Sequence, residues 1–448
     1  MPPQRSGSQN AAETFQSPMS PANTTTTAGI ACRPAMAWQV ALLALWLVGN
    51  QATAALAQQN LFGDDGIPYG RAPINYDAPA TANPVATLAT ELAAGHKKLT
   101  FEAGQGYLRS LLAALEVPVQ SQVLVFSKSS LNERLISPAV PRAIYFNDQV
   151  YVAWVPGAAA LEISVMDRDK GAVFYTLVQQ PQAVPRFERD QRCMVCHVSS
   201  STLDVPGHVL RSFETSETGK LLTGYSQTTH DTPYAQRWGG WYVTGKASKL
   251  PHLGNLMGEA QYARSRSEPQ PGSVLPELAG RFDPADYLTA TSDVVALLVL
   301  DHQVHFQNLC IRLSMESRLG LPADTTARRL ARYMLFADAP ALPAAVAGSS
   351  GFDGWFERQG QGTTAGRLRK LNLKDRLLEH RLSYLVASAA FDALPTPARA
   401  AVYRQVASLL LGEGTGRLDW PPKERLATWR LLLAVRGDVP EDLRQRAP

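Results

Sequence analysis

Cysteine is scarce in this chain, since only 4 of its 448 residues are Cys. That number is too small for the disulfide framework that holds many small secreted domains together. Charged residues are also few, at 18% of the sequence against roughly 25% in typical soluble domains. The formal net charge is only +4, whereas a nucleic-acid-binding protein concentrates basic residues on one face. We therefore expect no nucleic acid among the partners of this protein.

The first 57 residues have the composition of an export signal. After a polar leader, Arg33 precedes the apolar run 40–48, and small residues follow at 52–57. This order is typical of a secretory signal peptide, with cleavage here after Ala57. The apolar run is shorter than the roughly 20 residues of a membrane-spanning helix. We predict export to the periplasm through the Sec route, with membrane association only if the segment is retained. The sequence leaves open whether translation begins at Met36.

The hydrophobic pattern divides the chain into four regions. Residues 1–57 are the leader and signal peptide, and residues 58–90 lack periodicity and are predicted to be a linker. Residues 91–185 begin with a helical pattern and continue in short β-branched and aromatic runs separated by turns, which is typical of a β-meander. Residues 186–448 are loop-rich at first and then mainly helical. The expected fold class is α+β, with a β-containing amino-terminal half and a mainly helical carboxy-terminal half.

Individual elements follow from the same patterns. The predicted strands are 123–126, 143–146, 150–155, 161–165 and 172–177, with a hairpin around 241–244. The predicted helices are 91–116, 294–312, 324–337, 373–393, 397–411 and 423–436. Thr291 or Ser292 is expected to cap the helix that begins at Val294.

One motif carries specific chemistry: C-x-x-C-H at Cys193, Cys196 and His197. Its two thiols can add across the two vinyl groups of haem, and the spacing places both sulfurs on one turn of chain. The histidine that follows then supplies the proximal ligand to the iron. Because the motif lies behind an export signal, we predict one covalent haem c. The loop-rich segment after residue 186 is therefore expected to be cytochrome c-like.

Two other uses of paired cysteines stay open. A thioredoxin-like disulfide needs a βαβ context, which residues 185–189 do not clearly show. A zinc site needs a second pair of ligands at regular spacing, but Cys310 is solitary. Because Cys310 lies on the apolar side of a predicted helix, we expect it to be a buried thiol.

The second axial ligand of the haem is less determined by the sequence. Our leading candidate is His252, because its Gly-Asn loop can bring backbone close to a haem face. His302 is next, followed by His230. Met257, a softer sulfur ligand, is an alternative. The last possibility is that the sixth coordination position of the iron is open.

The other histidines are weaker candidates. His208 follows the motif closely and is expected near the haem edge, whereas His96 and His380 are expected on the surface. His305 shares a helical face with His302. The aromatic segment 237–245 would either wall a haem pocket or form a packed hairpin.

The chain resembles a family of large exported bacterial monohaem cytochrome c domain proteins of uncharacterised function. The resemblance covers about residues 100–435. It rests, in order, on segments 126–130, 141–148, 171–177, 193–197, 237–245 and 301–303. It implies haem attachment at the motif and histidines at His230, His252 and His302. The chain departs from the family pattern at His380, which weakens that residue as a ligand.

Three functions are compatible with these features. The leading one is a periplasmic c-type cytochrome that transfers electrons to and from redox partner proteins. The alternatives are a haem enzyme of peroxidase or oxygenase type and a haem-based gas sensor. The length favours the haem enzyme, because an electron carrier needs only one domain of roughly 100 residues.

Overall fold

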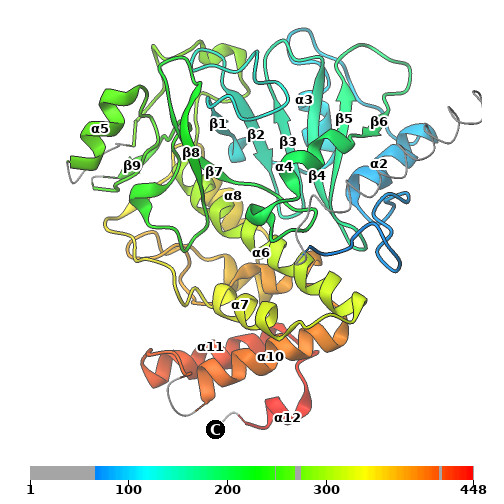
Figure 1. The fold of residues 1–448 in the computed structure, drawn as a ribbon, viewed down its shortest axis with the longest axis vertical. Coiled ribbons are helices and arrows are strands. Elements are labelled where there is room, and N and C mark those ends of the chain that lie inside the picture. The colour runs from blue at the N-terminus through cyan, green and yellow to red at the C-terminus, as the bar shows by residue number, and fades with distance from the viewer. Residues whose placement is uncertain (1–65, 248, 268–273, 413–415, 447–448) are drawn as a thin grey trace, which may run out of the picture. The chain divides into compact units, whose positions relative to one another are not determined.

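The structure is a computed structural model, and it describes residues 66–247, 249–267, 274–412 and 416–446 (Figure 1). The predicted signal peptide at 1–57 lies outside the described residues, so export stays a prediction. The fold is α+β, as expected. A β-sheet lies in the first half of the described chain and helices dominate the second half.

The sheet has six strands that pair with their sequence neighbours, each antiparallel to the next. This order confirms the predicted meander. The strands are β1 (Val123–Val125), β2 (Arg142–Phe146), β3 (Val150–Trp154), β4 (Ala160–Asp167), β5 (Gly171–Val178) and β6 (Phe187–Arg189). The last of these was not among the predicted strands.

Alternating side chains give the sheet two distinct faces. Leu161 and Ile163 of β4 are buried in a core that includes α2 (Pro84–Ala93) and α3 (Leu108–Ala114). Ser164 points to the opposite face, which carries the C-x-x-C-H motif. The sheet therefore separates the first two described helices from the motif.

The segment before α2 differs from the predicted linker, because its described part packs on the sheet. Ile74 and Tyr76 are buried. The Tyr76 hydroxyl donates to the carbonyl of Ala172 at 2.8 Å, and Lys170 Nζ donates to the carbonyls of Ile74 and Asn75. Tertiary contacts hold this segment, and its lack of periodicity did not reveal them.

Helix α6 (Val294–Leu319) is the central element of the described chain. Figure 1 shows it between the sheet and the carboxy-terminal helices. It has the length and hydropathy of a membrane span, but its most apolar stretch is entirely buried within the protein, as in a core helix. Its amino-terminal cap is Asp293, whose side chain accepts from the amides of Val295 and Ala296. The expectation of Thr291 or Ser292 as the cap was wrong.

Most of the predicted carboxy-terminal helices are confirmed. The remaining described helices are α4 (Met194–His197), α5 (Glu259–Ser267), α7 (Asp324–Met334), α8 (Phe352–Arg358), α9 (Ala389–Asp392), α10 (Thr396–Leu411), α11 (Pro422–Val435) and α12 (Glu441–Arg444). Short two-stranded sheets pair β7 (Arg211–Thr215) with β8 (Leu221–Gln227), and β9 (Lys246–Ala247) with β10 (Val346–Ala347).

Three predicted elements differ from the structure. The helix predicted over 373–393 is largely irregular, because Asn372 Oδ1 accepts from the amides of Lys374 and Asp375 and so favours a turn. The region 91–116 holds the end of α2 and all of α3 rather than one helix. The predicted hairpin at 241–244 makes isolated bridges instead, and the hairpin of this region is β7–β8.

The cap of α6 is a point where loss of one side chain should cost much stability. Asp293 is fully buried, and its second oxygen accepts from the amides of Ser349 and Ser350. Asp293→Ala leaves these buried donors unsatisfied, so we expect a loss of about 3 kcal/mol in the free energy of unfolding. Urea denaturation followed by circular dichroism measures this loss.

The matched control is Asp283→Ala. Asp283 is exposed and caps a single turn through the amide of Ala285. We expect this change to cost less than about 1 kcal/mol. Equal losses in the two variants would contradict the role of Asp293.

Candidate functional site

The C-x-x-C-H motif forms one turn of chain on the surface of the sheet. A short 3-10 turn (Gln191–Cys193) leads directly into α4. Cys193 is half-buried against a small apolar cluster, whereas Cys196 is exposed and Val195 has 84% of its surface exposed. Both cysteines are free thiols. Burial raises the pKa of the Cys193 thiol to about 12, so it is protonated at neutral pH.

His197 is oriented by a single backbone hydrogen bond. Its Nδ1 lies 2.8 Å from the carbonyl oxygen of Gly207, so Nδ1 carries the proton and donates it. Its Nε2 makes no hydrogen bond with any described residue. Burial lowers the pKa of His197 to about 4, and the Gly207 carbonyl offsets this only in part. The neutral imidazole therefore presents an unpaired Nε2 lone pair, which is the form that binds a metal ion.

Helix α6 holds the loop that supplies this carbonyl. The amide of His208 donates to Asn308 Oδ1 at 2.9 Å, and Asn308 Nδ2 donates to the carbonyl of His208 at 2.8 Å. A side chain at Gly207 would meet Asn308 Oδ1 at 2.5 Å, so only glycine fits there. The amide of Gly207 also donates to the carbonyl of His197 at 3.0 Å. These contacts lock the motif to the core.

His208 lies close to the motif, as the sequence indicated, but both of its ring nitrogens are engaged. Nδ1 is 2.8 Å from Ser164 Oγ, and Nε2 is 3.3 Å from Met166 Sδ. Its ring also packs on Tyr151, with 4.5 Å between centroids. These contacts make His208 part of the wall beneath the motif.

Charged side chains surround the motif. Arg142 pairs with Glu162 at 3.4 Å, and Asn132 Nδ2 donates to the same carboxylate at 2.8 Å. On the other side, Arg211 approaches the carbonyl of Cys196 at 3.5 Å. Both guanidinium groups contribute to lowering the pKa of His197.

His252 lies in the protein core beside Trp238. His252 is fully buried, its ring centroid is 5.4 Å from that of Trp238, and no described side chain hydrogen-bonds to either ring nitrogen. Trp238 Nε1 donates to Asp301 on α6. The motif, by contrast, is joined to α6 at Asn308, about 10 Å further along the helix.

His302 and His230 pair with each other in a buried cluster. Their Nδ1 atoms are 2.6 Å apart, and His302 Nε2 is 2.7 Å from Ser383 Oγ. His230 stacks on Tyr333 with 3.7 Å between centroids, and its Nε2 is 2.9 Å from Asp231 Oδ1. Burial holds the pKa of both histidines well below the usual value. Both Nδ1 atoms and His302 Nε2 are therefore engaged in a structural network, whereas His230 Nε2 faces Asp231 without hydrogen-bond geometry.

The remaining candidates are also away from the motif. Met257 packs in the core that includes Leu161 and Ile163, on the other face of the sheet. His96 is exposed, as expected. His380 is half-buried and lines a cavity of about 100 Å³ together with His230.

The aromatic segment 237–245 anchors a loop to α6. Arg237 and Asp301 form an ion pair at 3.0 Å in which both side chains are buried. Trp238 Nε1 donates to the same carboxylate at 3.1 Å, and Trp241 Nε1 donates to the carbonyl of Arg211 at 2.9 Å. The segment makes isolated bridges and does not form the predicted hairpin.

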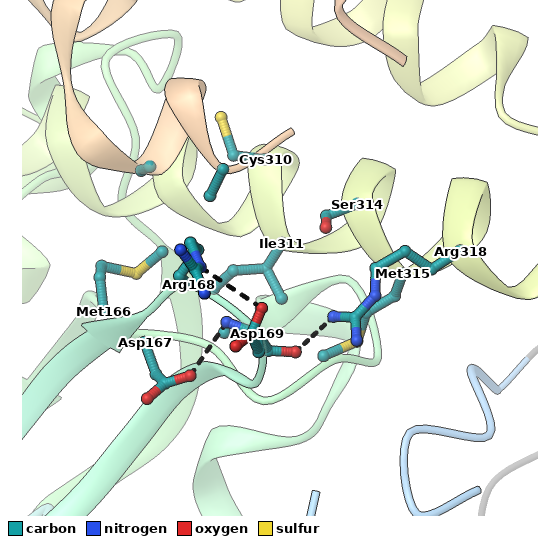
Figure 2. Close-up of a pocket in the computed structure, with 12 residues that line it drawn as sticks. Met166, Asp167, Arg168, Asp169, Cys310, Ile311, Ser314, Met315 and Arg318 are labelled. Carbon is teal, nitrogen blue, oxygen red and sulfur yellow. Dashed lines mark hydrogen bonds and ion pairs between the residues drawn. The ribbon is translucent and has the colours of Figure 1, made fainter. Parts of the chain in front are cut away.

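Cys310 is buried on α6, as predicted, and burial raises the pKa of its thiol far above the usual value. Cys310 lines a small cavity of about 20 Å³ together with Met166 and Asp169 (Figure 2). This volume suits a single water molecule. The described residues contain no group of three or more His, Cys, Asp or Glu side chains placed to bind a metal ion, as a zinc site would need.

Comparison of the chain with protein-family models, curated proteins and solved structures found no match. The resemblance to exported monohaem cytochrome c domain proteins therefore stays a prediction.

Because the buried histidines stay neutral in the folded protein, its stability should fall as the pH falls. The unfolded chain takes up a proton on His302 near pH 6.5, whereas the folded chain does not until much lower pH. The free energy of unfolding is therefore unaffected by protonation of His302 above about pH 6.5, and it decreases as the pH falls below that value. His302→Gln should flatten the fall in the free energy of unfolding between pH 7 and 5, by up to about 1.4 kcal/mol per pH unit.

Urea denaturation at several pH values measures this slope. His96→Gln serves as the control, because His96 is exposed and outside the cluster. If His302→Gln and His96→Gln keep the same slope as the unmodified protein, His302 is not held neutral by the fold.

Proposed function

We propose that this protein is a periplasmic c-type cytochrome in which Cys193, Cys196 and His197 hold one covalent haem c. The proposal rests on the hydrogen bonding of the two ring nitrogens of His197. Its Nδ1 is fixed by the Gly207 carbonyl, its Nε2 has no partner among the described residues, and two free thiols lie on the same turn. A porphyrin supplies four ligands to its iron, so a single protein histidine suffices as the proximal one.

The cysteines fit their part in the attachment. Each thiol would add across one vinyl group: the sulfur bonds to the carbon next to the ring, and hydrogen goes to the terminal carbon. The S–H bond and the vinyl double bond are replaced by C–S and C–H bonds, so no oxidant is consumed. The exposure of Cys196 leaves the motif open to the machinery that carries out this step.

The remaining residues would prepare the proximal ligand. When bound, haem supplies an iron that cycles between two oxidation states. The Gly207 carbonyl selects the tautomer of His197 and raises the basicity of its Nε2. Asn308 keeps this carbonyl in place through the backbone of His208. The exposed Val195 and Cys196 would leave one edge of the site accessible to a redox partner protein.

One observation favours the second candidate function, a haem enzyme or gas sensor. His252, the expected distal ligand, packs beside Trp238, whose Nε1 donates to Asp301 on α6, and His230 and His302 bond to each other. With this arrangement retained, the sixth position of the iron would be open to a small ligand. A reduced spectrum that ignores CO supports the electron carrier, and rapid CO binding supports the alternative.

Covalent attachment is tested by mass and absorbance. We expect mature protein, expressed with a working maturation system, to weigh one haem more than its polypeptide and to keep its Soret band after denaturation. The double variant Cys193→Ala, Cys196→Ala should lose both. Cys310→Ala should keep both, because Cys310 is buried on α6 away from the motif turn. A wild-type mass equal to that of the polypeptide would overturn the proposal.

The distal ligand is tested separately. We expect His252→Ala to leave the reduced and ferric spectra of the haem protein unchanged. His252 packs beside Trp238, which is bonded to α6 at Asp301, whereas the motif loop is bonded to α6 at Asn308, about two turns further on. His302→Ala should behave in the same way. A change from a low-spin to a high-spin ferric spectrum in His252→Ala would show instead that His252 ligates the iron.

A further inference from the structure

Arg211 is held against the motif by three contacts. Its Nη2 lies 3.5 Å from the carbonyl oxygen of Cys196 and 3.4 Å from Ser199 Oγ. Its guanidinium carbon lies 4.2 Å from the centroid of the Tyr225 ring, a cation–π arrangement. The Tyr225 hydroxyl is in turn bonded to Ser201 Oγ at 3.0 Å. The guanidinium is therefore positioned by neutral groups only.

The charge of Arg211 is not balanced by a neighbour. No carboxylate of the described residues lies within ion-pair distance of its guanidinium, and its Nε is buried without a hydrogen-bond partner. The other arginines near the motif differ in this respect. Arg142 is paired with Glu162 at 3.4 Å, and Arg192 is paired with Asp190 at 2.6 Å. Arg211 thus leaves a net positive charge beside Cys196.

We infer that Arg211 is a positioning residue for electron transfer, which raises the reduction potential of the haem bound at the motif. This inference rests on the proposed function. Oxidation of the iron adds one positive charge at the site, and a fixed cation nearby repels that charge. The reduced state is therefore favoured. Charge and exposure near a haem are among the means by which proteins set its potential.

The stack on Tyr225 holds the charge of Arg211 in one place. Tyr225 has 44% of its surface exposed, which is unusual for a large aromatic side chain, and its face is covered by the guanidinium of Arg211. The stack reduces the freedom of a long side chain that would otherwise extend into water. It keeps the charge near the motif, where its field would reach a haem bound there.

The experiment is a redox titration of the purified haem protein, followed through the absorbance of the reduced haem. Arg211→Gln should shift the midpoint potential to lower values, and Arg211→Lys should keep most of the wild-type potential. Tyr225→Leu should give a smaller shift in the same direction as Arg211→Gln. Raising the ionic strength should narrow the difference between wild type and Arg211→Gln.

The control is Arg404→Gln, which removes the same charge from an exposed position on α10. We expect it to leave the potential unchanged. If Arg211→Gln retains the covalent haem mass and the wild-type spectrum but does not shift the potential, the inference is wrong while the proposed function stands. If wild type itself carries no haem, the proposed function has failed. If Arg211→Gln does not fold, an unshifted Tyr225→Leu overturns the inference.

Discussion

The two hydrogen bonds between the side-chain amide of Asn308 and the backbone of His208 connect the functional motif to the core. They fix the loop that carries Gly207, and the carbonyl of Gly207 determines which nitrogen of His197 bears the proton. Because Asn308 is fully buried on α6, breaking these bonds would leave polar groups without partners in a dry environment. The orientation of the motif histidine thus depends on one amide in the centre of the protein.

Side chains of helix α6 make several hydrogen bonds and ion pairs to distant segments along its length. It is apolar enough to resemble a membrane span, yet its middle turns carry buried polar side chains from Asp301 to Asn308. Each of those described above has a defined partner: Asp301 pairs with Arg237, His302 with His230, and Asn308 with the motif loop. Buried polar groups that are satisfied in this way favour one arrangement of the surrounding loops over others. The histidines remain neutral there because burial makes their charged forms costly.

The surroundings of the motif combine apolar exposure with unequal charge. Val195 and Cys196 face outward, whereas Phe174 packs on the His197 ring with 4.4 Å between centroids. Of the two arginines whose fields reach His197, one is compensated by a carboxylate and the other is not. In the proposed cytochrome, one open edge and one uncompensated cation would suit electron exchange with a partner protein.

The sequence by itself determined the elements whose signals are local. The β-meander follows from short apolar runs between turns, α6 follows from its long apolar pattern, and the C-x-x-C-H motif lies within five consecutive residues. Only the tertiary structure decided which distant groups meet. The choice of Gly207 as the partner of His197, the pairing of His230 with His302 and the burial of His252 depend on contacts between segments far apart in the chain. Periodicity describes which side of an element is apolar, but it carries no information about the element that will cover that side.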